Sequence, residues 1–360
     1  MTGTHKIAII GAASILGKEL SEALADSTLA GADFSLMDDE SQLGQLEAVG
    51  DEVTFIQRIE PSSFDGADFV FFSGSQEVTR KHWKSAQKAG ASIIDLSYAL
   101  EAEPGVVVRA PWVAPPGASG INSGIDETRS DGSALNLSTQ AVVPAHPVAV
   151  ALGLILARAQ ELSPVRNASA TVLEPASEYG HAALDELHQQ TVGLLNFQGT
   201  PKAIFDTQVA FNISPVFGAE AKADLRESET RIRRHYDLLA DDDNLPKLAI
   251  QLLHAPVFHG HGISLALEFD RPVQLDHLEA ALSGEHVDVV MGDAESDVPN
   301  NLNTVGQGDV MVRVRTADGS PQPANRFWIW ASLDNLKFTA LNAVACALEL
   351  SKLRPQGKVQ

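Results

Sequence analysis

The segment Lys6-Ile-Ala-Ile-Ile-Gly-Ala-Ala-Ser-Ile-Leu-Gly17 decides how the first part of this chain folds. An isoleucine-rich run comes first, and a helical pattern follows to about residue 29. This order predicts a strand, a glycine turn and a helix, an arrangement that lets backbone N–H groups approach a pyrophosphate. Ser14 stands where such turns usually have their middle glycine; its Cβ can crowd a phosphate, although its hydroxyl can donate to one. We predict a nucleotide site at Gly11, Ser14, Ile15 and Gly17, and the alternative is a tight turn without a ligand.

Strands and helices continue to alternate through the first 140 residues. Strands are expected at 34–37, 53–59, 68–73 and 92–95, and a helix is expected over 78–89. Such alternation implies a parallel sheet with right-handed crossovers, so residues 1–140 are predicted to form a Rossmann-type dinucleotide-binding domain.

Asp38 follows the second expected strand. A carboxylate at this place can accept hydrogen bonds from a ribose 2′-hydroxyl and repels a 2′-phosphate. The sequence therefore favours NAD and disfavours NADP, and it leaves open that no nucleotide is bound.

Residues 141–331 are predicted to form an α+β domain with a large mixed sheet. Its strands are expected at 168–174, 208–213, 249–257, 262–269, 310–315 and 326–331, and its helices over 148–162, 180–195, 227–239 and 275–282. A closing helix within residues 332–360 is expected to return to the first domain. The predicted fold class is thus α/β, with a Rossmann-type parallel sheet followed by this second domain.

Charge and composition exclude several classes of partner. The 360 residues include 47 acidic and 26 basic side chains, which gives a formal charge of −21. Such a chain repels phosphate, so neither nucleic acid nor an anionic membrane surface is an expected partner. The apolar runs fall short of the ~20 residues of a membrane span, and the N-terminus lacks a signal-peptide pattern. A cytoplasmic protein is therefore expected.

The chain has one cysteine, Cys346, so no intrachain disulfide can form. It lies in an apolar helical pattern and is predicted to be a buried, inert thiol, because free cysteines are among the most buried residues. A mechanism that needs a cysteine nucleophile would have to use this one.

Three stretches of the second part carry a resemblance to a known family. Residues 208–218 read Gln-Val-Ala-Phe-Asn-Ile-Ser-Pro-Val-Phe-Gly, residues 255–261 read Ala-Pro-Val-Phe-His-Gly-His, and residues 334–344 read Asp-Asn-Leu-Lys-Phe-Thr-Ala-Leu-Asn-Ala-Val. Together with the glycine turn, they resemble the aspartate-semialdehyde dehydrogenase family over nearly the whole chain. The resemblance implies a phosphorylating dehydrogenase scaffold with a nicotinamide nucleotide and a homodimer formed by the second domain.

The resemblance places the family's catalytic roles on residues that do not suit them. His146 stands where the thiol nucleophile is expected, and Glu174 stands at the position of the glutamine that holds the acyl intermediate. His254 and Glu101 take the places of the arginines that bind the substrate carboxylate and phosphate. His261, which corresponds to the catalytic histidine, is the one retained group.

These replacements remove the chemistry of the family. A thiolate is a strong nucleophile and a good leaving group, whereas an imidazole is a poor substitute for it. The loss of two arginines removes bidentate contacts to anions. Compared with the family, the loop at the start of residues 334–344 is one residue shorter and lacks the glycine that approaches the nicotinamide. Asn335 is the nucleotide contact that we still predict in this loop. Phosphorylating dehydrogenation is therefore not expected.

Three functions remain open. The favoured one is a divergent paralogue without dehydrogenase activity, a pseudoenzyme that acts as a dimeric ligand-binding or regulatory protein with a small-molecule ligand. The second is an enzyme with altered chemistry on the same scaffold, either an NAD-dependent oxidoreductase or an enzyme that uses histidine or a metal. The third is the parental dehydrogenase, acting through a rearranged site.

The histidines suggest a metal as an alternative. His254, His259 and His261 fall on one predicted strand pattern, in which the last two share a face. With His146 and Glu174 they could bind Zn²⁺ or another transition metal. Neutral, hydrogen-bonded histidines at a relict site are the simpler interpretation, so no metal ligand is assigned.

The last predicted strand of the second domain carries apolar residues on both faces. Phe327, Ile329 and Ala331 alternate with Trp328 and Trp330. Helices are available to cover one face only, so a second copy of the chain is expected to cover the other.

Overall fold

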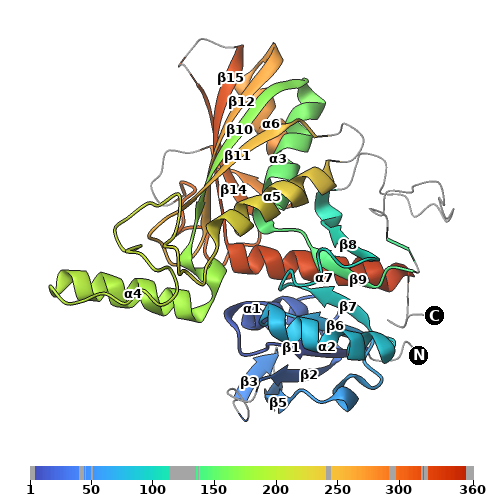
Figure 1. The fold of residues 1–360 in the computed structure, drawn as a ribbon. Helices are drawn as coiled ribbons and strands as arrows, with labels where there is room; N and C mark the ends of the chain where they lie inside the picture. The colour runs from blue at the N-terminus through green and yellow to red at the C-terminus, as the bar shows by residue number, and fades with distance from the viewer. Residues whose placement is uncertain are drawn as a thin grey trace. The chain divides into compact units, whose positions relative to one another are not determined.

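The structure is a computed structural model that describes most of the chain. The described residues are 5–39, 44, 46–49, 52–113, 135–136, 138–240, 245–291, 297–317, 319 and 323–353. The chain divides into two compact units, coloured along the sequence in Figure 1. Unit 1 comprises Met1–Ala145 with Thr339–Gln360, and unit 2 comprises His146–Phe338. The units divide after Ala145 and Phe338. The boundaries expected from the sequence lie a few residues earlier, after residues 140 and 331.

A seven-stranded parallel sheet forms the centre of unit 1, in the order β5-β2-β1-β6-β7-β9-β8. Its strands are β1 (Lys6–Ile10), β2 (Asp33–Asp38), β5 (Gln57–Arg58), β6 (Phe69–Phe72), β7 (Ser92–Asp95), β8 (Val106–Arg109) and β9 (Ala141–Pro144). Short 3₁₀ turns lie at η2 (Pro61–Phe64) and η3 (Pro111–Val113). β8 and β9 were not predicted.

Helices cover both faces of this sheet. Alternate residues of β1 separate into two cores: Ile7 and Ile9 pack with α1 (Ile15–Ala25) and α7 (Asn335–Leu353), while Ile10 packs in the core that contains Trp83 of α2 (Gln76–Lys88). All four residues of β6 are buried, as expected for a parallel strand between two helical layers. The C-terminal part of α7 thus contributes to the core of unit 1.

The prediction of one continuous strand over 53–59 is wrong, because this segment forms two strands. β4 (Glu52–Phe55) pairs antiparallel with β3 (Leu46–Val49) in a separate two-stranded ribbon, and β5 joins the edge of the main sheet. Ile56, which is 2% exposed, separates the two strands. One apolar run in the sequence therefore belongs to two sheets.

A six-stranded mixed sheet forms unit 2, in the order β11-β10-β12-β15-β14-β13. Its strands are β10 (Val165–Glu174), β11 (Leu248–His254), β12 (His261–Val273), β13 (Val287–Val289), β14 (Val310–Thr316) and β15 (Ala324–Leu333). Pairs β10–β11 and β13–β14 are parallel, and the other pairs are antiparallel. The predicted fold class is confirmed.

The helices of unit 2 lie mainly on one face of its sheet. Figure 1 shows α3 (Pro147–Leu162), α5 (Leu225–Leu239) and α6 (Leu275–Leu282) side by side there. Ile263, Leu265 and Ile329 are buried at alternate strand positions, whereas Trp328 on the opposite face is 37% exposed. After η4 (Ala176–Tyr179), helix α4 (His181–Leu195) extends away from the sheet.

The predicted strand Gln208–Ile213 is wrong, because side chains of α4 hold this segment in an irregular conformation. The carboxamide oxygen of Gln190 accepts from the N–H groups of Val209 and Ala210, at 2.8 and 3.2 Å. The carboxamide nitrogen of Gln190 donates to the carbonyls of Pro201 and Thr207. Backbone groups that a sheet would have paired are therefore satisfied by one buried side chain.

Among the described residues, no helix is long and apolar enough to cross a membrane.

Candidate functional site

The strand register of unit 2 gathers three predicted site residues at one end of its sheet. β10 and β11 run parallel, with Glu174 opposite His254 at their carboxyl ends. β12 runs antiparallel to β10 and pairs Gly262 with Leu173, so that His261 begins β12 beside the end of β10. The three side chains are 0% exposed.

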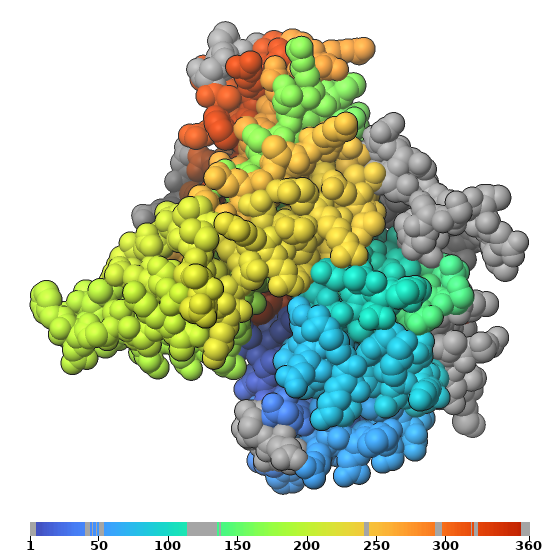
Figure 2. Space-filling model, viewed as in Figure 1, coloured from blue at the N-terminus to red at the C-terminus, as the bar shows by residue number. Residues whose placement is uncertain are grey.

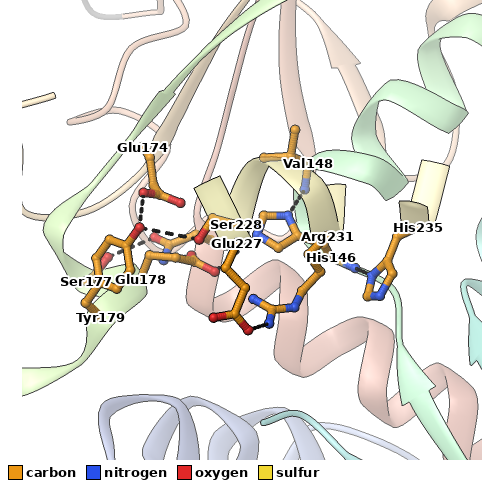
Figure 3. A network of polar contacts seen from close by, with 11 residues as sticks. His146, Val148, Glu174, Ser177, Glu178, Tyr179, Glu227, Ser228, Arg231 and His235 are labelled. Carbon is orange, nitrogen blue, oxygen red and sulfur yellow. Dashed lines mark hydrogen bonds and ion pairs between the residues drawn. The ribbon is translucent and has the colours of Figure 1, made fainter. Parts of the chain in front are cut away.

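His146 caps the N-terminus of α3 and is 1% exposed. Its Nδ1 accepts from the Val148 N–H at 3.3 Å, and its own backbone N–H donates to Nδ1 of His235 at 2.9 Å. Because Nδ1 accepts a hydrogen bond, the network assigns the ring proton to Nε2. That nitrogen lies 3.2 Å from Oε1 of Glu178, to which it donates (Figure 3).

Glu178 joins His146 to the beginning of α7. It lies in η4, directly after β10, and its second carboxylate oxygen accepts from the Asn335 side chain at 3.1 Å. The Asn335 oxygen accepts in turn from the Ser177 hydroxyl and the Gly260 N–H. Burial alone would raise the pKa of Glu178, but the hydrogen bonds from His146 and Asn335 lower it to about 2. This carboxylate is therefore ionised at neutral pH.

His261 lies beside His146, with ring centroids 5.8 Å apart and planes at 71°. Neither of its buried ring nitrogens has a hydrogen-bond partner among the described residues. Burial lowers the pKa of His261 to about 4, against the opposing effect of Glu178. His261 is thus a neutral imidazole with an unused lone pair and an unused N–H.

Glu174 has a different protonation state from Glu178. Burial, followed by the negative charge of Glu178, raises the pKa of Glu174 to about 8. The Tyr179 hydroxyl donates to one of its oxygens at 2.7 Å and also contacts the Ser228 hydroxyl at 3.3 Å (Figure 3). A glutamic acid that is mostly protonated at pH 7 is neutral and close in shape to glutamine, the residue that the family resemblance implies there.

His254 does not join the cluster of His146 and His261. Its ring packs against Phe205 and Phe217, at centroid distances of 5.0 and 5.2 Å. Within the part of the chain that the structure describes, its two nitrogens have no hydrogen-bond partner. Burial lowers the pKa of His254 to about 4. An aromatic environment of this kind suits a neutral ring.

The expectation that His254, His259 and His261 share one strand pattern is wrong. His254 ends β11 and His261 begins β12, while His259 lies in the connection between them. Gly260 has a φ of +83°, a left-handed conformation that breaks the alternation. His259 and His261 therefore do not lie at i and i+2 of one strand.

The glycine turn of unit 1 has the predicted strand–turn–helix form. Gly11 has a φ of +84°, and a Cβ there would lie 2.3 Å from the backbone of Gly74. A Cβ on Gly17 would lie 2.3 Å from the carbonyl oxygen of Gly11. Both glycines are thus required by close backbone packing, whether or not a nucleotide binds.

Other predicted nucleotide contacts already have partners within unit 1. The Ser14 hydroxyl donates to the carbonyl of Ser73 at 2.9 Å and accepts from the Gly17 N–H at 2.8 Å. Through this second bond Ser14 caps the N-terminus of α1, which begins at Ile15. Its proton is therefore already donated. Asp38, at the end of β2, accepts from the Ala13 N–H at 2.9 Å, so its carboxylate lies against the turn.

Glu101 and Cys346 also lie in unit 1. Glu101 follows β7 in a turn, where its charge adds to the effect of burial in raising the pKa of Asp95. Cys346 is 0% exposed within α7, as predicted, and burial raises the pKa of its thiol. The sulfur lies 3.6 Å from the carbonyl oxygen of Arg109.

Two family models match the chain. One describes the semialdehyde dehydrogenase NAD-binding domain and matches residues 6–120. The other describes the semialdehyde dehydrogenase dimerisation domain and matches residues 156–338, just over half of the chain. The chain belongs to the semialdehyde dehydrogenase family. The predicted family is thereby confirmed, and unit 1 contains its nucleotide-binding domain.

Individual relatives span the whole length of this semialdehyde dehydrogenase family member. A USG-1 protein homolog of Azotobacter vinelandii is 30% identical over 356 residues, which are 98% of this chain and 99% of that protein. An aspartate-semialdehyde dehydrogenase of Rickettsia bellii is 27% identical over 354 residues, with 98% and 99% covered. The structure of a probable aspartate-semialdehyde dehydrogenase from Pseudomonas aeruginosa superposes with a TM-score of 0.78 at 26% identity, covering 97% of this chain and 99% of that one.

Sequence reasoning missed Glu178. It lies outside any strand or long helix, in a four-residue 3₁₀ turn, so no periodic pattern indicated it. The available signal was its spacing: Glu178 follows Glu174 by one turn, directly after a strand that the family resemblance already placed in the site.

The buried, neutral state of His254 predicts a pH-dependent stability. An unfolded histidine titrates near 6.5, so between pH 6.5 and 4 the unfolded chain binds more protons and stability falls as pH falls. In His254→Phe this contribution disappears. When the pH falls from 7 to 4.5, the free energy of unfolding should fall by about 2–3 kcal/mol less in the variant than in the wild type. Urea unfolding at both pH values measures the difference.

His188→Asn, at an exposed position of α4, is the control and should show the same pH dependence as the wild type. If the stability of His254→Phe also changes with pH as that of the wild type does, the neutral, buried state of His254 is contradicted.

Proposed function

We propose that this chain is a homodimeric member of the semialdehyde dehydrogenase family that lacks dehydrogenase activity and acts as a ligand-binding or regulatory paralogue. The observation that carries the proposal is the place of its one cysteine. Cys346 is buried in α7 of unit 1, whereas the N-terminus of α3, where the family resemblance puts the nucleophile, holds His146 hydrogen-bonded to Glu178. A thioester intermediate therefore has no suitable sulfur.

The remaining substitutions support the same function. His254 is neutral at pH 7 and lies among aromatic rings, so it cannot replace an arginine that binds a carboxylate. Glu101 would repel a phosphate rather than bind it. Glu174 keeps the neutral character of the expected glutamine. Because Glu178 is ionised, an uncharged or cationic ligand suits its surroundings better than an anion.

A second candidate function is favoured by one observation. His146, Glu178 and His261 converge within unit 2, and such a set can carry out proton transfer or metal-assisted chemistry. This corresponds to an enzyme with altered chemistry on the family scaffold. We propose a cytoplasmic location for either function.

Neither the wild type nor His146→Cys should oxidise aspartate semialdehyde with phosphate and NAD or NADP. The variant restores a thiol at the helix N-terminus but leaves Glu101 and His254 in place of two arginines, so substrate binding is not restored. NADPH or NADH formation followed at 340 nm measures the activity, with the Rickettsia bellii aspartate-semialdehyde dehydrogenase as positive control. Turnover by the wild type that is lost in His261→Asn would overturn the proposed function.

If unit 1 binds a nucleotide, we propose NAD rather than NADP. The carboxylate of Asp38 lies against the glycine turn and would repel a 2′-phosphate. Titration calorimetry should give a dissociation constant for NAD about tenfold lower than that for NADP, and Asp38→Asn should narrow this ratio. Asp33→Asn, at the exposed opposite end of β2, is the matched control. Tighter binding of NADP to the wild type would reject the assignment.

The homodimer is proposed to form through unit 2, which matches the family's dimerisation domain. The outer face of its sheet has a shallow hollow of about 630 Å³, lined in part by Ala266, Arg326 and Trp328. α4 and the segment after it, yellow-green in Figure 2, form a projecting surface on which Leu195 and Phe197 are 67% and 99% exposed. Exposed apolar surface of this kind is typical of protein interfaces.

Light scattering at low micromolar protein should give twice the 38.3 kDa chain mass. Trp328→Glu should shift the mass towards that of a monomer, because a desolvated carboxylate opposes association. Phe55→Glu, which changes a more exposed apolar residue of unit 1, should leave the dimer intact. A monomeric wild type would contradict the proposal.

A further inference from the structure

Three potential metal ligands converge in unit 2 from three different elements. His146 comes from the N-terminus of α3, Glu178 from η4 and His261 from the first position of β12. One ligand atom of each lies within 4.8 Å of the ligand atoms of the other two. His146 and His261 are almost completely buried, and Glu178 is 15% exposed.

We propose that His146, Glu178 and His261 bind one divalent transition-metal ion, with Zn²⁺ the ion that suits two imidazoles and one carboxylate. Two histidines and a glutamate, with a fourth position open to an oxygen donor, are an established ligand set for Zn²⁺. The ligands carry one negative charge in total, which partly neutralises a divalent cation. The site is independent of whether the chain oxidises an aldehyde, and it would give the ligand-binding unit a Lewis acid.

The unsatisfied imidazole of His261 is the strongest support. A buried ring nitrogen without a hydrogen bond costs free energy, and buried polar side chains nearly always have a partner. In the described part of the chain, both nitrogens of His261 lack a hydrogen-bond partner, although an ionised carboxylate and a second imidazole lie beside the ring. Coordination of an ion would use the lone pair of one nitrogen.

The spacing of the ligand atoms is close to that of a tetrahedral site. With metal–ligand distances of about 2.0–2.1 Å, neighbouring ligand atoms lie roughly 3.3–3.4 Å apart. Nε2 of His146 and Oε1 of Glu178 are already 3.2 Å apart. The remaining separations are at most 4.8 Å and would close by rotation of the His261 side chain.

Metal binding would have one local cost. Coordination through Nε2 of His146 moves the ring proton to Nδ1, which then no longer accepts from the Val148 N–H. Binding therefore breaks this capping bond of 3.3 Å and requires the His146 ring to turn, so that its new N–H does not face the Val148 N–H.

The carboxylate is already oriented for binding. Asn335 donates to the far oxygen of Glu178, and Asn335 is itself fixed by Ser177 and the Gly260 N–H. Such outer contacts hold metal-ligating groups in position. Glu174 and His254 are engaged elsewhere, with Tyr179 and with aromatic rings, so the site has three protein ligands. The open position would accept water or the carbonyl or hydroxyl oxygen of a small ligand.

Titration of the chelator-treated full-length protein with Zn²⁺ tests the site. Calorimetry should give one ion per chain, and Co²⁺ should give the visible absorption of a four-coordinate ion with nitrogen and oxygen ligands. Glu178→Gln and His261→Asn should each weaken Zn²⁺ binding by about 100-fold or more, since loss of an outer contact alone typically costs 10–100-fold. Glu178→Gln keeps the side-chain shape and so serves if His261→Asn fails to fold.

His259→Asn is the matched control, because this histidine lies two residues from His261 but outside the ligand set. It should bind Zn²⁺ like the wild type. Absence of binding to the folded wild type, or binding that survives in both ligand variants, would overturn the proposal. The dehydrogenase assay does not depend on added metal, so failure of the metal site and failure of the proposed function are separate results.

Discussion

The register of β10 against its two neighbours is the constraint on which the site in unit 2 depends. Parallel pairing puts Glu174 opposite His254, and antiparallel pairing puts His261 at the same end of the sheet. A shift of one residue would turn these side chains to the other face, because strand side chains alternate. Their burial in turn requires α3 and α5 on the inner face. The core packing of unit 2 therefore fixes where His254 and His261 lie, and their burial keeps both rings neutral.

The ionised carboxylate of Glu178 organises its neighbours in this cluster. Glu178 stays charged because His146 and Asn335 donate to it, and its charge helps to keep Glu174 protonated. Two carboxylates four residues apart thus have pKa values of about 2 and about 8. Divergent pKa values of this kind are common at functional sites, although structural networks also produce them. Here Glu178 accepts hydrogen bonds from His146 of the α3 N-terminus and from Asn335 of α7, and its charge raises the pKa of Glu174 in β10.

Local pattern predicted the parts of the fold that local interactions determine. The strand–turn–helix at Gly11–Gly17 and the alternation in unit 1 followed from glycine placement and buried strands. The segment Gln208–Ile213 has a strand-like composition, but its backbone groups are satisfied by Gln190, a contact between residues about 20 apart that no periodicity reveals. The break at Gly260 likewise depends on a left-handed conformation rather than on hydropathy. In the candidate site, His146 and His261 were predicted from the sequence. Glu178 was not, because its role depends on the contact of η4 with the N-terminus of α3.

The pairing of His146 with Glu178 follows from the electrostatics of a helix N-terminus. The partial positive charge of the helix dipole stabilises a thiolate there, which is the group that the family resemblance implies, and destabilises an imidazolium. His146 instead accepts the Val148 N–H with its Nδ1, which places the ring proton on Nε2. That tautomer directs an N–H outward from Nε2, and a buried N–H requires an acceptor. Glu178 provides one and also returns a negative charge to the helix end. At the position where the family resemblance implies a thiol, His146 and Glu178 depend on each other, because removal of the carboxylate would leave a buried donor unsatisfied.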